Sequence, residues 1–321
     1  MKVSIIVPIY KVENEIERCL QSVLDQTYDK MELILVNDAT PDKSFEIAKE
    51  YLANRSVFNK EIVFVEHEVN QGLSVARNSG IKASSGDYLF FLDSDDALEN
   101  LSVIADMVSI LLENQFPEVV MGNFNRYDGD KFIETLDLIE RLYSNNTDIY
   151  TAFVAGDLWM TAWGKLVSRK IIVDHQLLFK EGIYHEDELW SFLLFRTIES
   201  LYVTPKPVYS YYERAGSIMS NCKEKNVRDF LTVTLDMYKA YQDNPAYMPK
   251  QTFISLEYAR RAVLQKSFYV NDPELIQFAL TELKKIKIPL LGTGKTSFLK
   301  QNLLLRFPAK FIVNYLRIKY R

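Results

Sequence analysis

The chain has 321 residues, a formal net charge of −5 and 48% hydrophobic residues, which is enough for one large or two smaller domains with a packed core. This composition excludes a disordered polypeptide, and two cysteines, Cys19 and Cys222, exclude a disulfide framework. No apolar run approaches the roughly 18 residues of a membrane-spanning helix, and the N-terminal run is too short for a signal peptide. We therefore expect a globular protein of a reducing, cytoplasmic compartment.

Short apolar segments alternate with helical patterns near the start of the chain. Strands are predicted at 3–10, 31–36, 61–65 and 87–92, and helices at 16–24, 42–53 and 73–83. This alternation predicts right-handed βαβ units and an α/β fold with a mostly parallel sheet. Farther along, the pattern predicts a helix at 101–114, a strand at 118–122 and helices from 225 onward.

Polar side chains follow three of the predicted strands at the points where the strands end. The three sets are Pro8 and Tyr10, then Asn37 and Asp38, and finally Asp93, Asp95 and Asp96. Parallel strands place their carboxyl ends along one edge of a sheet, and such sheets bind ligands at that edge. We therefore expect the three sets to converge on one binding site.

The aspartates after the fourth strand bring like charges together, and a divalent cation offsets their repulsion. The alternation Asp93-Ser94-Asp95 allows both carboxylates to face the same side of an extended segment. The alternative is that Asp95 or Asp96 caps a helix that begins near Leu98. A cap needs only one carboxylate and leaves Asp93 unexplained.

Four segments resemble the motifs of the family 2 glycosyltransferases, in the family's order and approximate spacing. They are SIIVPIY (4–10) followed by Glu13, LILVNDATPDKS (33–44), NQGLSVARNSGIKASSGDYLFFLDSDD (70–96) and EDELW (186–190). The resemblance implies a GT-A catalytic domain at 1–215, with a nucleotide-sugar-binding half at 1–98 and an acceptor half at 99–215. The remaining residues, 216–321, would form a helical C-terminal region.

The resemblance also implies roles for individual residues. The nucleotide would be held by residues after the first two strands, with support from an arginine: Pro8, Tyr10, Glu13, Asp38 and Arg77. The segment Asp93-Ser94-Asp95 would be the DxD motif, in which Asp93 contacts the ribose and Asp95 binds Mn²⁺ or Mg²⁺ on the diphosphate. Asp187, or else its neighbour Glu186, would be the catalytic base, although the same acidic residues suit the first turn of a helix at 187–198.

Two further segments resemble parts of the family. In WMTAWGKLVSR (159–169), Trp163 and Lys165 would line the acceptor site, although core packing also explains the tryptophan. In YYERAGSI (211–218), Arg214 would pair with the diphosphate, with an ordinary surface arginine as the alternative.

Two positions depart from the family's common pattern. Lys11 stands where the family often has asparagine, and Ala39-Thr40 stands where the family often has Gly-Ser. Neither departure removes a carboxylate or an aromatic side chain.

These features predict an inverting, metal-assisted hexosyltransferase that uses a nucleotide-sugar, in most members a UDP-sugar, and a saccharide or glycolipid acceptor. A sugar nucleotidyltransferase would need a glycine-rich loop after the first strand, which VPIYKVENE (7–15) lacks. A non-catalytic nucleotide-sugar-binding module is the other alternative, and the retained carboxylates argue against it. LLGTGKTS (290–297) is not a P-loop, because Pro289 takes the place of the required first glycine.

The C-terminal segment 284–321 carries ten Lys and Arg residues and no Asp or Glu. Its mixture of basic, apolar and aromatic residues predicts contact with an anionic membrane, on the inner face of the cell membrane. The alternative is that its apolar face packs on the catalytic domain or on a second subunit of a homo-oligomer. The acidic body and the lack of a recognition motif argue against nucleic acid.

Overall fold

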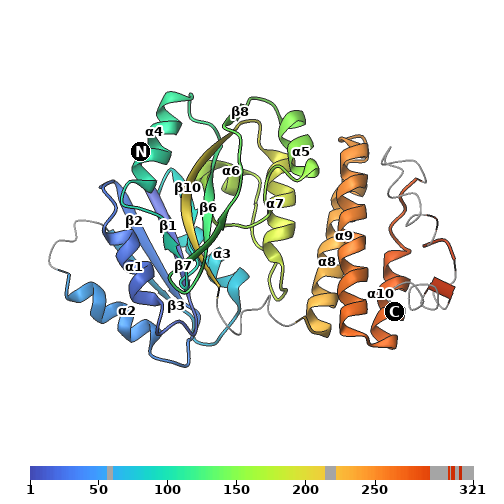
Figure 1. The fold of residues 1–321 in the computed structure, drawn as a ribbon, viewed down its shortest axis with the longest axis horizontal. Helices are drawn as coiled ribbons and strands as arrows, with labels where there is room; N and C mark the ends of the chain where they lie inside the picture. The colour runs from blue at the N-terminus through green and yellow to red at the C-terminus, as the bar shows by residue number, and fades with distance from the viewer. Residues whose placement is uncertain (56–60, 214–221, 290–302, 304, 308–310, 313–321) are drawn as a thin grey trace. The chain divides into compact units, whose positions relative to one another are not determined.

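The computed structural model describes the whole chain except residues 56–60, 214–221, 290–302, 304, 308–310 and 313–321 (Figure 1). The chain divides into two compact units. Unit 1 comprises Met1–Ile149, Met160–Gly182 and Leu193–Arg214, and unit 2 comprises Tyr150–Trp159, Ile183–Phe192 and Ala215–Arg321. The functional boundaries expected at 98 and 215 stay a prediction, and two short internal segments group with the C-terminal helices.

The strands of the structure are β1 (Val3–Ile9), β2 (Met31–Asn37), β3 (Glu61–Glu66), β4 (Tyr88–Phe91), β5 (Ala97–Leu98), β6 (Val119–Asp128), β7 (Lys131–Thr135), β8 (Arg141–Tyr143), β9 (Lys165–Ser168) and β10 (Leu201–Glu213). The helices are α1 (Ile16–Leu24), α2 (Ser44–Ala53), α3 (Leu73–Ala83), α4 (Val103–Glu113), α5 (Asn146–Ala155), α6 (Arg169–Asp174), α7 (Glu186–Thr197), α8 (Glu224–Asp243), α9 (Pro249–Val270) and α10 (Pro273–Leu283).

The sheet of unit 1 has the strand order β3-β2-β1-β4-β9-β6-β10-β5. The four predicted N-terminal strands are confirmed, and they pair with one another in parallel. Strand β9 is antiparallel to both of its neighbours, β4 and β6, so the sheet is mixed. The alternative of a helix that begins near Leu98 is wrong, because residues 97–98 form β5 and α4 begins at Val103.

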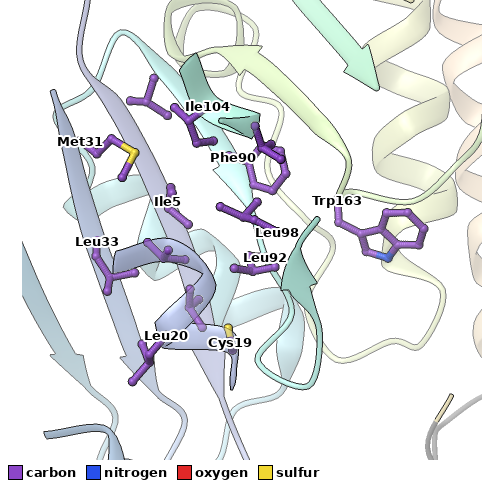
Figure 2. Packing of buried hydrophobic residues seen from close by; sticks show 14 of the residues in the cluster. Ile5, Cys19, Leu20, Met31, Leu33, Phe90, Leu92, Leu98, Ile104 and Trp163 are labelled. Atoms are coloured by element: carbon purple, nitrogen blue, oxygen red, sulfur yellow. The ribbon is translucent and has the colours of Figure 1, made fainter. Parts of the chain in front are cut away.

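Strands β1, β2 and β4 are buried along almost their whole length, which fits their largely apolar sequences, whereas β3 is partly exposed. On one face, alternate residues such as Ile5, Leu33 and Phe90 pack with Leu20 of α1 and Ile104 of α4 (Figure 2). On the other face, α3 lies so close to β1 that a Cβ atom on Gly80 would stand 2.3 Å from Cγ2 of Ile6. This close packing fixes α3 against the sheet.

In unit 2, α8, α9 and α10 pack against one another. Pro249 and Pro273 begin α9 and α10, where proline needs no hydrogen-bond partner for its nitrogen. Within the described part of the chain, no helix is both long enough and apolar enough to cross a membrane.

Candidate active site

The predicted convergence of strand ends is present in unit 1. Strand β1 lies between β2 and β4, and the register pairs Ile9 with Asn37 and Ile6 with Phe91. The segments that follow these strands therefore leave the same edge of the sheet side by side. They carry Tyr10, Asp38 and the aspartate loop, which we define as residues 92–96.

The three carboxylates of the aspartate loop have different environments. The side chain of Asp93 is 25% exposed and accepts a hydrogen bond from Nη2 of the buried Arg77 at 2.7 Å. Asp95 is partly buried. Asp96 is only 2% exposed. Two carboxylates therefore remain within reach of a ligand, and the third belongs to the protein interior.

Asp96 anchors the loop to β10. Its Oδ1 accepts the backbone N–H of Tyr212 at 2.8 Å, and its Oδ2 accepts the hydroxyl of Tyr209 at 2.7 Å. The same hydroxyl accepts the backbone N–H of Asp93 at 3.2 Å. Burial, together with the charges of Asp95 and Asp93, raises the pKa of Asp96 well above its usual range. The third aspartate is thus a structural anchor.

Arg18 of α1 holds the backbone of the aspartate loop from another side. Its Nη2 donates to the carbonyl oxygen of Asp95 at 2.6 Å. The guanidinium lies over the ring of Tyr212, 3.6 Å from the centroid, in a cation–π contact. Tyr212 in turn stacks on Tyr127 of β6, with ring centroids 5.1 Å apart. The side chain of Arg18 is therefore held by a pair of stacked aromatic rings.

The aspartate loop fits a divalent cation that is shared with a diphosphate. In the described residues, no cluster of three or more His, Cys, Asp or Glu side chains could enclose a metal ion. Mg²⁺ in nucleotide sites is usually held by one or two carboxylates, with phosphate oxygens and water as its other ligands. Asp93 and Asp95 would provide this smaller donor set, and Mn²⁺ also accepts carboxylate and water ligands.

Asp38 holds the loop between β3 and α3. Its two oxygens accept four hydrogen bonds, each 2.8 Å long, from Nδ1 of His67, Nδ2 of Asn70 and the backbone N–H groups of Gln71 and Gly72. These bonds use the roughly four lone-pair sites of a carboxylate. The expected base contact of Asp38 stays a prediction, and these bonds favour an indirect role through the loop.

His67 is a further candidate, which no motif in the sequence singles out. Besides Asp38, it contacts the hydroxyl of Ser79 on α3, with Nε2 and Oγ 2.9 Å apart. The histidine is largely buried between them. Only these hydrogen bonds identify His67 as a candidate, since Asp38 and Ser79 lie far from it in the sequence.

The remaining nucleotide-site candidates lie near the ends of β1 and β4. Pro8 and Ser94 are buried, whereas Tyr10 is 39% exposed and Glu13 is exposed. Glu13 accepts the backbone N–H of Lys43 at 3.3 Å. Tyr10 is the aromatic candidate in this group, and Nζ of Lys11 lies 5.2 Å from the centroid of its ring.

Two turns at this edge adopt left-handed backbone conformations. Lys11 has φ 56° and Ala39 has φ 49°. Asparagine and glycine tolerate this region better than lysine and alanine do. At these two positions, the residues that depart from the family's pattern make the left-handed conformation less favourable in free energy, and both residues still adopt it.

The candidates for acceptor binding lie in the core of unit 1. Trp163 is 8% exposed and stacks on Tyr209, with ring centroids 4.3 Å apart. Lys165 is fully buried, and its Nζ donates to the carbonyl oxygen of Thr161. The expected acceptor contact of Lys165 does not fit this burial, while Trp163 supports Tyr209 beneath the aspartate loop. Arg214 lies outside the described residues, as does LLGTGKTS (290–297).

The candidate base lies in unit 2, at the start of α7. Glu186 is 6% exposed, whereas Asp187 is only partly buried. Burial and the neighbouring charge of Asp187 raise the pKa of Glu188 to about 8, against the opposing charge of Lys266. This shift favours the protonated form of Glu188. Of the three acids, Asp187 best combines access with its place in the motif.

Comparison with known proteins shows the family of the chain. The profile of glycosyl transferase family 2 matches residues 4–173. Glycosyltransferase GlyA of Streptococcus pneumoniae is 33% identical over 300 residues, which cover 88% of this chain and 42% of GlyA. The putative glycosyltransferase EpsH of Bacillus subtilis is 30% identical over 256 residues, which cover 77% of this chain and 69% of EpsH.

Among solved structures, S. aureus TarS 1-349 in complex with UDP has a TM-score of 0.74 and 19% sequence identity, over 98% of this chain and 89% of that chain. The sheet and its flanking helices thus define a GT-A-like fold. The chain belongs to glycosyltransferase family 2, as its motifs indicated. It spans less than half the length of GlyA.

Proposed function

We propose that this protein transfers a sugar from a nucleoside-diphosphate sugar to a hydroxyl group of a saccharide or glycolipid acceptor, with inversion at the anomeric carbon. The observation that carries the proposal is the aspartate loop, in which Asp93 and Asp95 stay accessible while Asp96, Tyr209 and Arg18 fix the backbone. A helix cap would not need this bracing from two separate elements.

In the proposed reaction, the acceptor oxygen attacks the anomeric carbon as the bond to the β-phosphate oxygen breaks. The electron pair of that bond leaves with the nucleoside diphosphate, and the acceptor proton passes to the carboxylate of Asp187. Such general-base catalysis typically contributes about 10²–10⁴-fold. Mn²⁺ or Mg²⁺ held by Asp93 and Asp95 would neutralise charge on the diphosphate. A single displacement with one base implies inversion.

UDP-sugars are the donors that we propose first. TarS has been solved in complex with UDP and with UDP-GlcNAc, and its fold is shared over nearly the whole chain. On the protein side, the exposed ring of Tyr10 lies at the edge of the sheet where the base would bind. A uracil base stacks on such a ring without needing the oxygens of Asp38.

A donor panel tests the proposed function. Purified protein is mixed with UDP-, GDP- and dTDP-sugars in the presence of Mn²⁺ or of EDTA, and release of the nucleoside diphosphate is measured with saccharide acceptors. We expect turnover of one donor class, with Mn²⁺ only, and a product of inverted anomeric configuration. A retained anomer would contradict the single displacement. Binding of a nucleotide-sugar without turnover on any acceptor would favour the non-catalytic module instead.

We also propose that segment 284–321 contacts an anionic membrane surface, where lipid-linked acceptors are found. Within its described residues, Phe307 and Phe311 are 43% and 52% exposed, while Ile312 is buried. An amphipathic basic segment of this kind binds anionic lipids. Co-sedimentation with vesicles of phosphatidylglycerol, and not with phosphatidylcholine vesicles, is the expected result. Absence of the protein from both pellets would favour packing of the segment on the protein, and equal binding to both would contradict a role for the basic residues.

A further inference from the structure

Helix α8 contacts Tyr184 and His185, the two residues that precede the candidate base at the start of α7. The backbone N–H of Tyr184 donates to Oδ2 of Asp229 at 2.9 Å. Phe230, the next residue of α8, packs edge-to-face against the ring of His185, with centroids 5.1 Å apart. All of these residues belong to unit 2. The contacts therefore connect one helix to consecutive residues of one turn.

Lys225 of α8 makes two further contacts at this turn. Nζ of Lys225 lies 2.7 Å from Oδ2 of Asp229 and 4.5 Å from the centroid of the Tyr184 ring. An ordinary i,i+4 ion pair on a helix surface would point its carboxylate at solvent. Here the side chain of Asp229 is only 12% exposed, because it also receives the backbone of the turn.

The turn needs such support because of its backbone conformation. His185 has φ 64°, in the left-handed region that only a few per cent of non-glycine residues adopt, histidine more often than most. Residues in this region persist where the surrounding structure holds them. Helix α7 begins immediately afterwards at Glu186, and the carbonyl oxygen of His185 accepts the N–H of Glu188 at 3.2 Å. The direction of the turn therefore sets the first turn of α7, which carries Asp187.

We infer that Asp229 is a positioning residue for the transfer reaction, and that α8 holds the turn that presents Asp187. Only the expected effect on kcat rests on the proposed function. The contacts between α8 and the turn do not depend on it. This positioning role gives the C-terminal helices a part in the reaction, although the family profile ends before them, at residue 173.

The test compares Asp229→Ala, Asp229→Asn and a matched control, Glu224→Gln, which removes an exposed ion pair with Arg228 on the same helix. Hydrogen–deuterium exchange of the peptide that contains Tyr184 reports whether α8 holds this turn. The measurement does not require an active enzyme. We expect exchange there to rise about 10-fold in Asp229→Ala, because a charged hydrogen bond is lost. A smaller rise is expected in Asp229→Asn, which keeps an oxygen acceptor, and none in the control.

Kinetics then separate positioning from general stability. With the donor found in the panel, we expect kcat of Asp229→Ala to fall about 10- to 100-fold, with partial rescue in Asp229→Asn, while the Kd for UDP with Mn²⁺ stays within about twofold. Unchanged exchange at Tyr184 overturns the inference, as does raised exchange with unchanged kcat. If the wild type transfers no sugar at all, the proposed function fails, and the exchange result still decides whether α8 holds the turn.

Discussion

Replacing Asp95 by alanine is expected to lower sugar transfer by about 10²–10⁴-fold, because metal stabilisation of developing charge contributes several kcal/mol and each 1.4 kcal/mol is about tenfold in rate. Asp95 is partly buried at the edge where β4 ends, and its carboxylate is not the one that anchors the loop. The measurement is kcat/KM with increasing Mn²⁺. Wild-type activity should saturate with metal, and Asp95→Ala should not respond to it.

Two further variants make this result specific. Asp137→Ala removes an exposed aspartate of the same unit and should leave the activity unchanged. Asp96→Asn disturbs the anchor to Tyr209 and Tyr212, so it should lower the melting temperature, which Asp95→Ala should preserve. Wild-type metal dependence in Asp95→Ala would assign the cation to other ligands.

The second large effect is expected from Asp187→Asn. The substitution keeps the size of the side chain and removes its basicity, so turnover should fall by about 10²–10⁴-fold. The Kd for UDP with Mn²⁺ should change by less than about twofold, because the nucleotide candidates all belong to unit 1. Isothermal titration with UDP and initial rates with the active donor provide the two quantities.

The control for this experiment is Asp243→Asn, an exposed aspartate at the end of α8. It should match the wild type in both quantities. If Asp187→Asn keeps full turnover and Glu186→Gln loses it, the base is Glu186, despite its lower exposure. If both variants remain active, neither acid is the base and the proposed mechanism is wrong.

The donor side of the fold was predictable because its signals are local. Strands β1 and β2 are buried almost throughout, so each reads as an apolar run interrupted only by Ser4 or Glu32, and the polar residues after them mark the edge where such sheets bind ligands. Strand β9 is short, and it is defined by antiparallel partners far away in sequence, with Tyr88 opposite Ser168. No periodicity within four residues reveals such a pairing.

The site was predictable in its residue types and less so in its roles. Three aspartates within four positions predicted a metal site, yet the role of Asp96 depends on Tyr209, 113 residues away. The same holds for Asp38, which the motif marks as a ligand and the structure surrounds with donors from 67–72. A motif shows which residue types are present. Tertiary contacts determine which oxygens of each carboxylate remain available to a ligand.

The grouping of Ile183–Phe192 with the C-terminal helices has a consequence for how substitutions act. The aspartate loop and the turn before the candidate base are stabilised by separate sets of hydrogen bonds, one in each unit. Substitutions in α8 that break the bond to Tyr184 therefore leave the bonds of the aspartate loop intact, so the two parts of the candidate site are open to separate engineering.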